Sequence, residues 1–231
     1  MSKADSVTFP IQEFLKRLAF RSGVIKTRYD FLLEPNELLE LMLALRRGEN
    51  LEGDVIEVGV ARGRTTVFLN RFLDSLNSVK TYHVVDTFSG FVAEDVAHEQ
   101  LNRGKQAYSY AGFSYNSPRV WERNIVQDNG LKRVKIIPRD IKQVHFDPKQ
   151  MFSTALLDVD LYLPTKVGLE IIYPRLVPGG TIIVDDACEG GAYEGAFAAF
   201  KEFAEMHPKE CRLLPPKCGI VIRSGSANGA K

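Results

Sequence analysis

The chain has 231 residues, of which 45% are hydrophobic and 26% are charged, and its formal net charge is +1. This is the composition of a globular protein with one well-buried domain and an accessory segment. Its 30 basic residues are scattered along the chain, which argues against nucleic acid as a partner. No apolar run approaches the roughly 20 residues of a membrane helix, and the amino terminus lacks a signal-peptide pattern, so we expect a cytoplasmic protein with no membrane partner.

The chain begins with helical patterns and continues with an alternation of strands and helices. In the first 50 residues, IQEFLKRLAF has helical apolar spacing and PNELLELMLALRR begins at a proline. We interpret residues 1–50 as an N-terminal helical cap. From Asp54 onward, helical stretches separate the strand candidates DVIEV, KTYHVVD, VKIIP, TALLDVD and TIIVDD, which is typical of a parallel sheet.

The last two strand candidates, CRLL and GIVIR, predict a different connection. They are joined through Pro215 and Pro216, and a turn this short cannot hold a crossover helix. The final strand should therefore run antiparallel to its predecessor, in an α/β protein with an otherwise parallel sheet. We assign the main domain to residues 51–224 and a flexible tail of small polar residues to 225–231.

Residues 87–118 are too many for a bare connection and are rich in Gly, Ser, Tyr and Phe. They predict a lid insertion with partial helices. Its aromatic side chains could line an apolar or sugar-stacking acceptor site, or they could pack the lid onto the body. These residues are Tyr108, Tyr110, Phe113 and Tyr115.

Two pairs of aspartates follow apolar strand candidates. Asp158 and Asp160 come after TALL, and Asp185 and Asp186 come after TIIV. Ligands bind at the carboxyl ends of the strands in open α/β sheets. Four carboxylates there would repel one another unless a cation or raised pKa values relieved the charge, and a hard divalent metal is the economical explanation. Alternatively, each aspartate only ends its strand as a turn former or helix N-cap.

The junction DVIEVGVARGRTT places Glu57 at a strand end, Gly59 in the turn and Gly63 at a helix start. Glycines let backbone amides approach a ligand closely, and a helix amino terminus favours negative charge. The spacing is not GxGxxG, which favours a nucleoside ligand with a carboxylate over a dinucleotide. Asp86, at the end of the second strand, could accept hydrogen bonds from both ribose hydroxyls, and Asp140 follows the third strand, near the expected place of an adenine ring.

Other polar and aromatic residues are better explained by packing. We expect His83, in the middle of a strand, to be a hydrogen-bonded core residue, and Trp121 to serve helix packing and not substrate contact. Cys188, Cys211 and Cys218 have no CxxC spacing, so we expect buried free thiols and neither a disulfide framework nor a zinc site.

The motifs GDVIEVGVARG, VVDTFSGF, LLDVDLYLPTKVGLEIIYPRLVPGG and IIVDDA resemble class I S-adenosylmethionine-dependent methyltransferases, and within them the macrocin O-methyltransferase (TylF-type) family. The resemblance runs from about Leu51 to about Phe203. It implies a Rossmann-like class I methyltransferase fold, with a seven-stranded, mostly parallel sheet, an antiparallel last strand and helices on both faces. It also implies S-adenosylmethionine as methyl donor, Mg²⁺ at the acidic edge, and a hydroxyl of a small molecule, such as a sugar or natural product, as acceptor.

The resemblance further implies roles for individual residues. It makes Asp158, Asp185 and Asp186 metal ligands and Asp160 the general base, although Asp158 could also take the base role. A hydroxyl is a poor nucleophile until it loses its proton, which a metal and a nearby carboxylate both promote. The predicted cofactor-binding residues are Glu57, Gly59, Val60, Gly63, Thr65, Thr66, Asp86, Thr87, Phe88, Asp140 and Asp158.

The chain departs from the family pattern at two positions beside the expected acceptor pocket. Ala61 replaces a common tryptophan and Ala187 replaces a usual tyrosine, which leaves open an acceptor other than the macrolide sugars of named members. A catechol-type Mg²⁺-dependent O-methyltransferase with a phenolic acceptor and a non-catalytic S-adenosylmethionine-binding protein are the alternatives. A nicotinamide oxidoreductase would require GxGxxG. The helical cap could also mediate a homodimer.

Overall fold

The computed structural model describes residues 5–24, 29, 31–106, 110–114, 116–190 and 193–225. The chain forms two compact units, Met1–Leu32 and Leu33–Lys231. In the first unit, helix α1 spans Asp5–Arg21. The predicted cap, residues 1–50, therefore spans both units. Residues 226–231 of the predicted tail lie outside the described residues.

The described part of the second unit contains a seven-stranded sheet with strand order β3-β2-β1-β4-β5-β7-β6. Neighbouring strands are parallel from β3 through to β5, whereas β7 runs antiparallel to both β5 and β6. The predicted reversal of the last strand is thus confirmed. The strands are β1 (Asp54–Val58), β2 (Tyr82–Asp86), β3 (Val134–Pro138), β4 (Phe152–Leu157), β5 (Leu176–Val184), β6 (Cys211–Leu214) and β7 (Cys218–Ile222).

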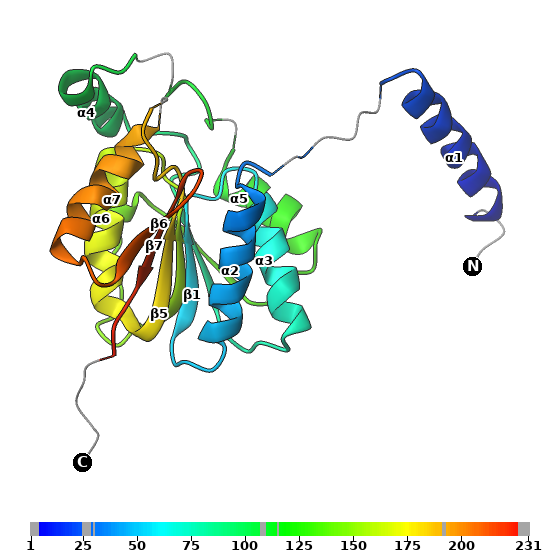
Figure 1. Cartoon of the computed structure of the whole chain (residues 1–231). Coiled ribbons are helices and arrows are strands. Elements are labelled where there is room, and N and C mark those ends of the chain that lie inside the picture. Colours follow the sequence, from blue (N-terminus) through cyan, green and yellow to red (C-terminus); the bar gives the residue numbers. More distant parts are fainter. Residues whose placement is uncertain are drawn as a thin grey trace. The chain divides into compact units, whose positions relative to one another are not determined.

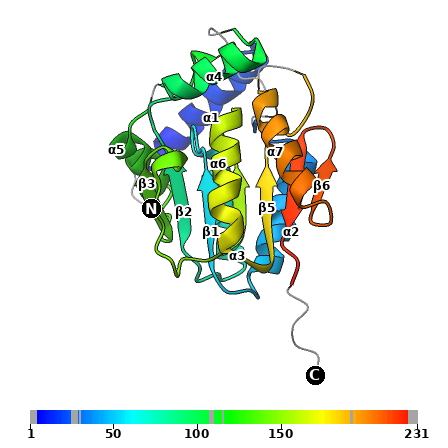
Figure 2. The same cartoon turned by 90° about the vertical axis from the view of Figure 1, so that its left-hand side faces the viewer.

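Helices cover both faces of this sheet. Figures 1 and 2 show α6 and α7 on one face and α2 and α3 on the other. The helices are α2 (Pro35–Gly48), α3 (Arg64–Ser75), α4 (Ala93–Arg103), α5 (Pro118–Trp121), α6 (Tyr162–Ile172) and α7 (Glu194–Met206), with a π-helix at Glu122–Gln127 and 3₁₀ turns at Ile141–Gln143 and Tyr173–Arg175. The helix between β2 and β3 that follows α4 is therefore a short α-helix that continues as a π-helix. No helix in the described ranges is long and apolar enough to cross a membrane.

The core lies on the central strands. Every residue of β4 is buried, as a strand covered on both faces requires. Side chains such as Ile56, Phe152 and Ile182 are 0% exposed, and burying each contributes about 1.5–3 kcal/mol. Helix α2 belongs to this body, because its Ala44 carbonyl accepts a hydrogen bond from the Thr154 hydroxyl of β4 at 3.3 Å.

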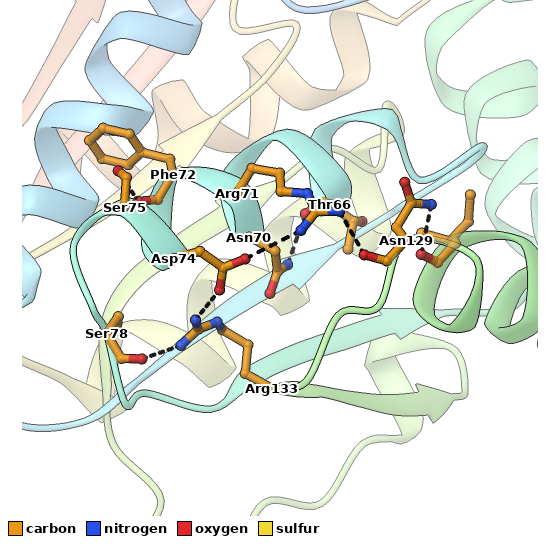
Figure 3. Close-up of polar contacts among 10 residues, drawn as sticks. Thr66, Asn70, Arg71, Phe72, Asp74, Ser75, Ser78, Asn129 and Arg133 are labelled. Atoms are coloured by element: carbon orange, nitrogen blue, oxygen red, sulfur yellow. Dashed lines mark hydrogen bonds and ion pairs between the residues drawn. The ribbon is translucent and has the colours of Figure 1, made fainter. Parts of the chain in front are cut away.

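Polar contacts fix the end of α3 against the neighbouring strands and loops (Figure 3). The guanidinium of Arg133, which precedes β3, donates to the Ser78 carbonyl and pairs with Asp74 near the end of α3. Arg71 donates to the Asn129 carbonyl at 2.7 Å. These contacts set the position of α3, whose opposite end begins at Gly63, close to the carboxyl end of β1.

Candidate active site

The two aspartate pairs meet at one edge of the sheet. Strands β4 and β5 are parallel neighbours, with Leu157 opposite Val184, and the Asp185 amide donates to the Leu157 carbonyl at 2.9 Å. Burial, together with the negative charges of the neighbouring aspartates, raises the pKa of Asp158, Asp160 and Asp185 above the usual range. The predicted gathering of carboxylates is therefore present, and their mutual repulsion is partly relieved by raised pKa values.

The backbone at this edge is strained. Asp160 and Asp186 have φ values of 62° and 55°, in the left-handed region that costs a non-glycine residue about 1–2 kcal/mol. The Asp160 carbonyl accepts the amide of Ala196 at 3.2 Å, and the Asp186 amide donates to the Asp185 carboxylate at 2.7 Å. Strain of this kind gathers at functional sites, where surrounding contacts hold it in place.

Lys217 is a site residue that the sequence analysis did not single out. Its Nζ lies 2.8 Å from Asp185 Oδ1, 3.0 Å from Asp185 Oδ2 and 2.9 Å from Asp186 Oδ1. Burial works against the charge of Lys217, but the two carboxylates outweigh it and raise its pKa above the usual range. The predicted reversal of β7 could have pointed to Lys217, because an antiparallel β7 places its first residues beside the end of β5.

Glu37, in the first turn of α2, is a second residue that was missed. It is 0% exposed, and its carboxyl group lies beside that of Asp185 without a hydrogen bond of ordinary geometry to any described residue. Burial, and then the charge of Asp185, raises the pKa of Glu37 to about 9. The sequence could have indicated the burial of Glu37, because this residue shares a helical face with the buried residues Leu41 and Ala44.

The predicted magnesium site has donors of the right chemistry but is not assembled as a ligand set. Within the described ranges, no group of three or more His, Cys, Asp or Glu side chains is arranged to hold a metal ion. Asp185 and Asp186 instead bind the Lys217 ammonium. Carboxylate oxygens are nevertheless the ligands that Mg²⁺ prefers, and the buried carboxyl of Glu37 interacts electrostatically with Asp158 and Asp185.

The glycine turn after β1 approaches β4 very closely. Gly59 has a φ of 83°, and a Cβ built on it would lie 1.8 Å from the Asp158 carbonyl oxygen. The Asp86 carboxylate ties this turn to the loop after β2, because it accepts the Val60 amide at 2.8 Å and the Phe88 amide at 2.6 Å. Predicted cofactor residues thus meet at the carboxyl ends of β1 and β2.

Gly63 caps α3 with a φ of 72°, and a Cβ there would lie 2.8 Å from the Ile125 side chain. Behind it, the buried Glu57 carboxylate accepts hydrogen bonds from the Thr66 hydroxyl at 2.6 Å and the Tyr82 hydroxyl at 2.9 Å. Burial raises the pKa of Glu57 to about 7 in spite of these two donors. Glu57 and Thr66 therefore support the turn from within, and their predicted contact with a cofactor stays a prediction.

The other predicted cofactor residues lie nearby with their own contacts. Thr65 is half-buried in the first turn of α3, and the Thr87 hydroxyl donates to the Gly90 carbonyl at 2.8 Å. Asp140 caps the 3₁₀ turn after β3 by accepting the Lys142 amide at 3.0 Å, and it pairs with the Lys142 ammonium at 3.4 Å. Its predicted place beside an adenine ring is untested.

Helix α4, within the predicted lid segment, is clamped onto the body by buried charges. Glu99 is 0% exposed, accepts the Tyr162 amide at the start of α6 at 2.8 Å, and pairs with Arg103 at 3.0 Å. The Arg103 guanidinium donates in turn to the Glu194 carbonyl at 3.1 Å. This part of the segment is fixed through its contacts with α6 and α7.

The aromatic residues of the lid segment pack on one another where they are described. The Phe91 ring lies 5.8 Å from that of Tyr110, 5.5 Å from that of Phe113 and 6.2 Å from that of Tyr193. Tyr108 and Tyr115 lie outside the described residues. Of the two interpretations, packing has direct support for Tyr110, which is 5% exposed.

The residues assigned to packing have that role. His83 is buried and contacts Asp54 through Nε2 at 3.0 Å. Trp121 is 1% exposed and meets the Phe88 ring at 5.6 Å. The three cysteines are free, as expected, but only Cys218 is fully buried. The Ala61 carbonyl accepts a hydrogen bond from the Asn116 side-chain amide at 3.0 Å. The Ala187 amide donates to the Lys217 carbonyl at 2.6 Å.

Comparisons with known proteins identify relatives of this chain. Residues 36–211 match the macrocin O-methyltransferase (TylF) family. An 8-demethyl-8-(2,3-dimethoxy-alpha-L-rhamnosyl)-tetracenomycin-C 4'-O-methyltransferase from Streptomyces olivaceus is 27% identical, with 71% of each chain covered. Mycinamicin III 3''-O-methyltransferase from Micromonospora griseorubida is 30% identical, with 71% of this chain and 64% of the relative covered.

Solved structures share the fold. The O-methyltransferase NovP superposes with a TM-score of 0.68 at 21% identity, covering 86% of this chain and 84% of its own. The calicheamicin methyltransferase CalS11 superposes with a TM-score of 0.61 at 20% identity, covering 81% and 78%. The Rossmann-like fold expected from the sequence is thereby confirmed.

Proposed function

The chain belongs to the macrocin O-methyltransferase (TylF) family of S-adenosylmethionine-dependent O-methyltransferases, and we propose that it methylates a hydroxyl of a sugar or other small natural-product acceptor with the help of Mg²⁺. One observation carries the proposal: the aspartates after β4 and β5 share an edge with the glycine turn after β1. The two relatives named above, whose names describe O-methylation of glycosylated natural products, support the acceptor class.

Cofactor binding is assigned to the turn after β1 and the loop after β2. S-adenosylmethionine, when bound, would supply a methyl group on a sulfonium, and an oxygen nucleophile would bond to that methyl carbon in line with the departing thioether. Gly59 and Gly63 adopt the left-handed backbone that shapes this turn, and the first turn of α3 presents amides that favour a carboxylate. Each Asp86 oxygen accepts one amide hydrogen bond and has a further lone pair for a ribose hydroxyl.

Proton removal is assigned to Asp160. Burial and the charge of Asp186 raise its pKa, and a carboxylate with a raised pKa is a stronger base near neutral pH. In this scheme the acceptor hydroxyl would donate a hydrogen bond to the Asp160 carboxylate, which would take its proton as the oxygen bonds to the transferred methyl group, with S-adenosylhomocysteine as the second product. Asp158 is the alternative base.

Metal binding is assigned to Asp158, Asp185 and Asp186. Mg²⁺ bound there would supply positive charge that lowers the pKa of an acceptor hydroxyl. The hard oxygen donors that gather at this edge support this assignment. The small-molecule acceptor, the homodimer and the cytoplasmic location stay predictions.

Calorimetric binding of S-adenosylhomocysteine tests the cofactor assignment. We expect Asp86→Asn to weaken binding at least tenfold, because one ribose hydroxyl loses a charged acceptor. Asp74→Asn removes the same charge at the far end of α3 and should bind like the wild type. Equal affinities for the two variants would contradict the assignment.

The metal and the acceptor need separate measurements. An Asp185→Asn, Asp186→Asn double variant should retain nucleoside binding and lose the heat of Mg²⁺ binding. Mass spectrometry of glycosylated and phenolic acceptors, incubated with enzyme and S-adenosylmethionine, identifies the acceptor class. Methylation of phenols alone would replace the sugar proposal with the catechol-type alternative.

A further inference from the structure

The Lys217 ammonium occupies the carboxylate oxygens that the proposed metal would need. It lies within 3.0 Å of both oxygens of Asp185 and 2.9 Å from Asp186 Oδ1. Mg²⁺ coordinates such oxygens at roughly 2.0–2.1 Å in octahedral geometry. An ammonium and a divalent cation cannot share these oxygens at such distances without strong mutual repulsion.

The fold delivers Lys217 to this position. Lys217 lies directly before β7, in the turn that follows β6, and its carbonyl accepts the Ala187 amide at 2.6 Å. The preceding Pro215 carbonyl accepts a hydrogen bond from the Asn36 side chain at the start of α2. The turn is therefore held from two sides, so the lysine backbone is anchored while its long side chain can still change rotamer.

The charges around Lys217 explain why a cation is needed there. Asp158, Asp160, Asp185, Asp186 and the buried Glu37 interact with one another at this edge. Lys217 is the basic side chain that contacts Asp185 and Asp186 in the described part of the chain, and it is 19% exposed. A single positive charge among so many carboxyl groups stabilises the edge when no metal is bound.

We propose that Lys217 is an internal counter-cation that competes with the divalent metal for Asp185 and Asp186. Metal loading then requires the ammonium to leave the pair, while its anchored backbone stays in place. This inference rests on the metal assignment made above. It makes Lys217 a residue that sets metal affinity.

Titration of the full chain with Mn²⁺ and Mg²⁺, followed by calorimetry, tests the competition. Lys217→Met and Lys217→Gln remove the charge, and we expect each to bind metal at least about tenfold more tightly than the wild type. Lys217→Arg keeps the charge and should bind metal no more tightly than the wild type. Lys166→Met, which removes a lysine paired with Glu202 on α7, should leave metal affinity unchanged.

Thermal unfolding gives a second readout that does not depend on activity. Without metal, the two neutral variants should unfold at a lower temperature than the wild type, and metal should raise their midpoints by more. Wild-type affinity, or weaker, in both neutral variants would overturn the inference and leave the metal assignment standing.

S-adenosylhomocysteine binding, measured in the same samples, distinguishes failure of the metal assignment from failure of the proposed function. If no variant binds metal but all bind the nucleoside, the metal assignment and this inference both fall and the methyl-donor site stands. If none binds the nucleoside either, the proposed function itself has failed.

Discussion

Replacing Gly59 with alanine should disrupt both the sheet and the cofactor turn. The new Cβ would lie 1.8 Å from the Asp158 carbonyl oxygen, a backbone atom that can move only if β1 and β4 separate. The φ of 83° adds the left-handed strain of about 1–2 kcal/mol. Separation of the strands would also weaken the bond from the Asp158 amide to the Val58 carbonyl, now 2.8 Å long, at a cost of about 1 kcal/mol.

We therefore expect Gly59→Ala to lower the free energy of unfolding by at least about 3 kcal/mol, once relief of the clash is added to these two costs. Gly130→Ala is the matched control, because Gly130 has a φ of 61° and a Cβ added there would meet no atom within 4 Å. The control should lose only about 1–2 kcal/mol of stability, from the strain of a left-handed alanine.

Urea unfolding at equilibrium measures both variants, and the difference between them isolates the close approach of the two strands. Gly59→Ala should also weaken S-adenosylhomocysteine binding, because the turn and Asp158 move together. Equal losses of stability in the two variants would refute the reasoning, since the clash would then cost nothing.

Two further predictions concern buried carboxylates. Glu99→Ala should destabilise the protein by about 1–3 kcal/mol in urea unfolding, because it leaves the Tyr162 amide without its buried acceptor and removes one ion-pair partner of Arg103. The exposed Glu202→Ala should cost less than about 1 kcal/mol, and similar losses would contradict this account. The folded-state pKa of Glu57, about 7, lies above its ordinary value of 4.5, so the folded protein binds this proton more tightly. The contribution of Glu57 to the free energy of unfolding should therefore fall by about 3 kcal/mol as pH rises from 4.5 to 7, in addition to the contributions of other groups. Glu57→Gln should lack that part of the pH dependence, and parallel stability–pH curves would exclude the assignment.

Local patterns were sufficient to predict the elements and the residues at their ends. Apolar runs identify the strands, and the short connection through Pro215 and Pro216 requires the reversed last strand. Because parallel strands place their carboxyl ends at one edge, Asp158 and Asp185 could be brought together without coordinates. Gly59 was expected in a tight turn for the same local reason.

Contacts between distant parts of the chain could not be obtained in this way. The strands, the reversed hairpin and the aspartates at the strand ends are readable from the amino-acid order, because they depend on near neighbours and on a period of two or 3.6 residues. The tertiary structure alone brings Glu37 and Lys217 to Asp185. Their proximity depends on α2 packing on the sheet and on β7 lying beside β5. A charge is recognised as a counter-ion only once its partners are known, and here the partners come from elements at opposite ends of the second unit's sequence.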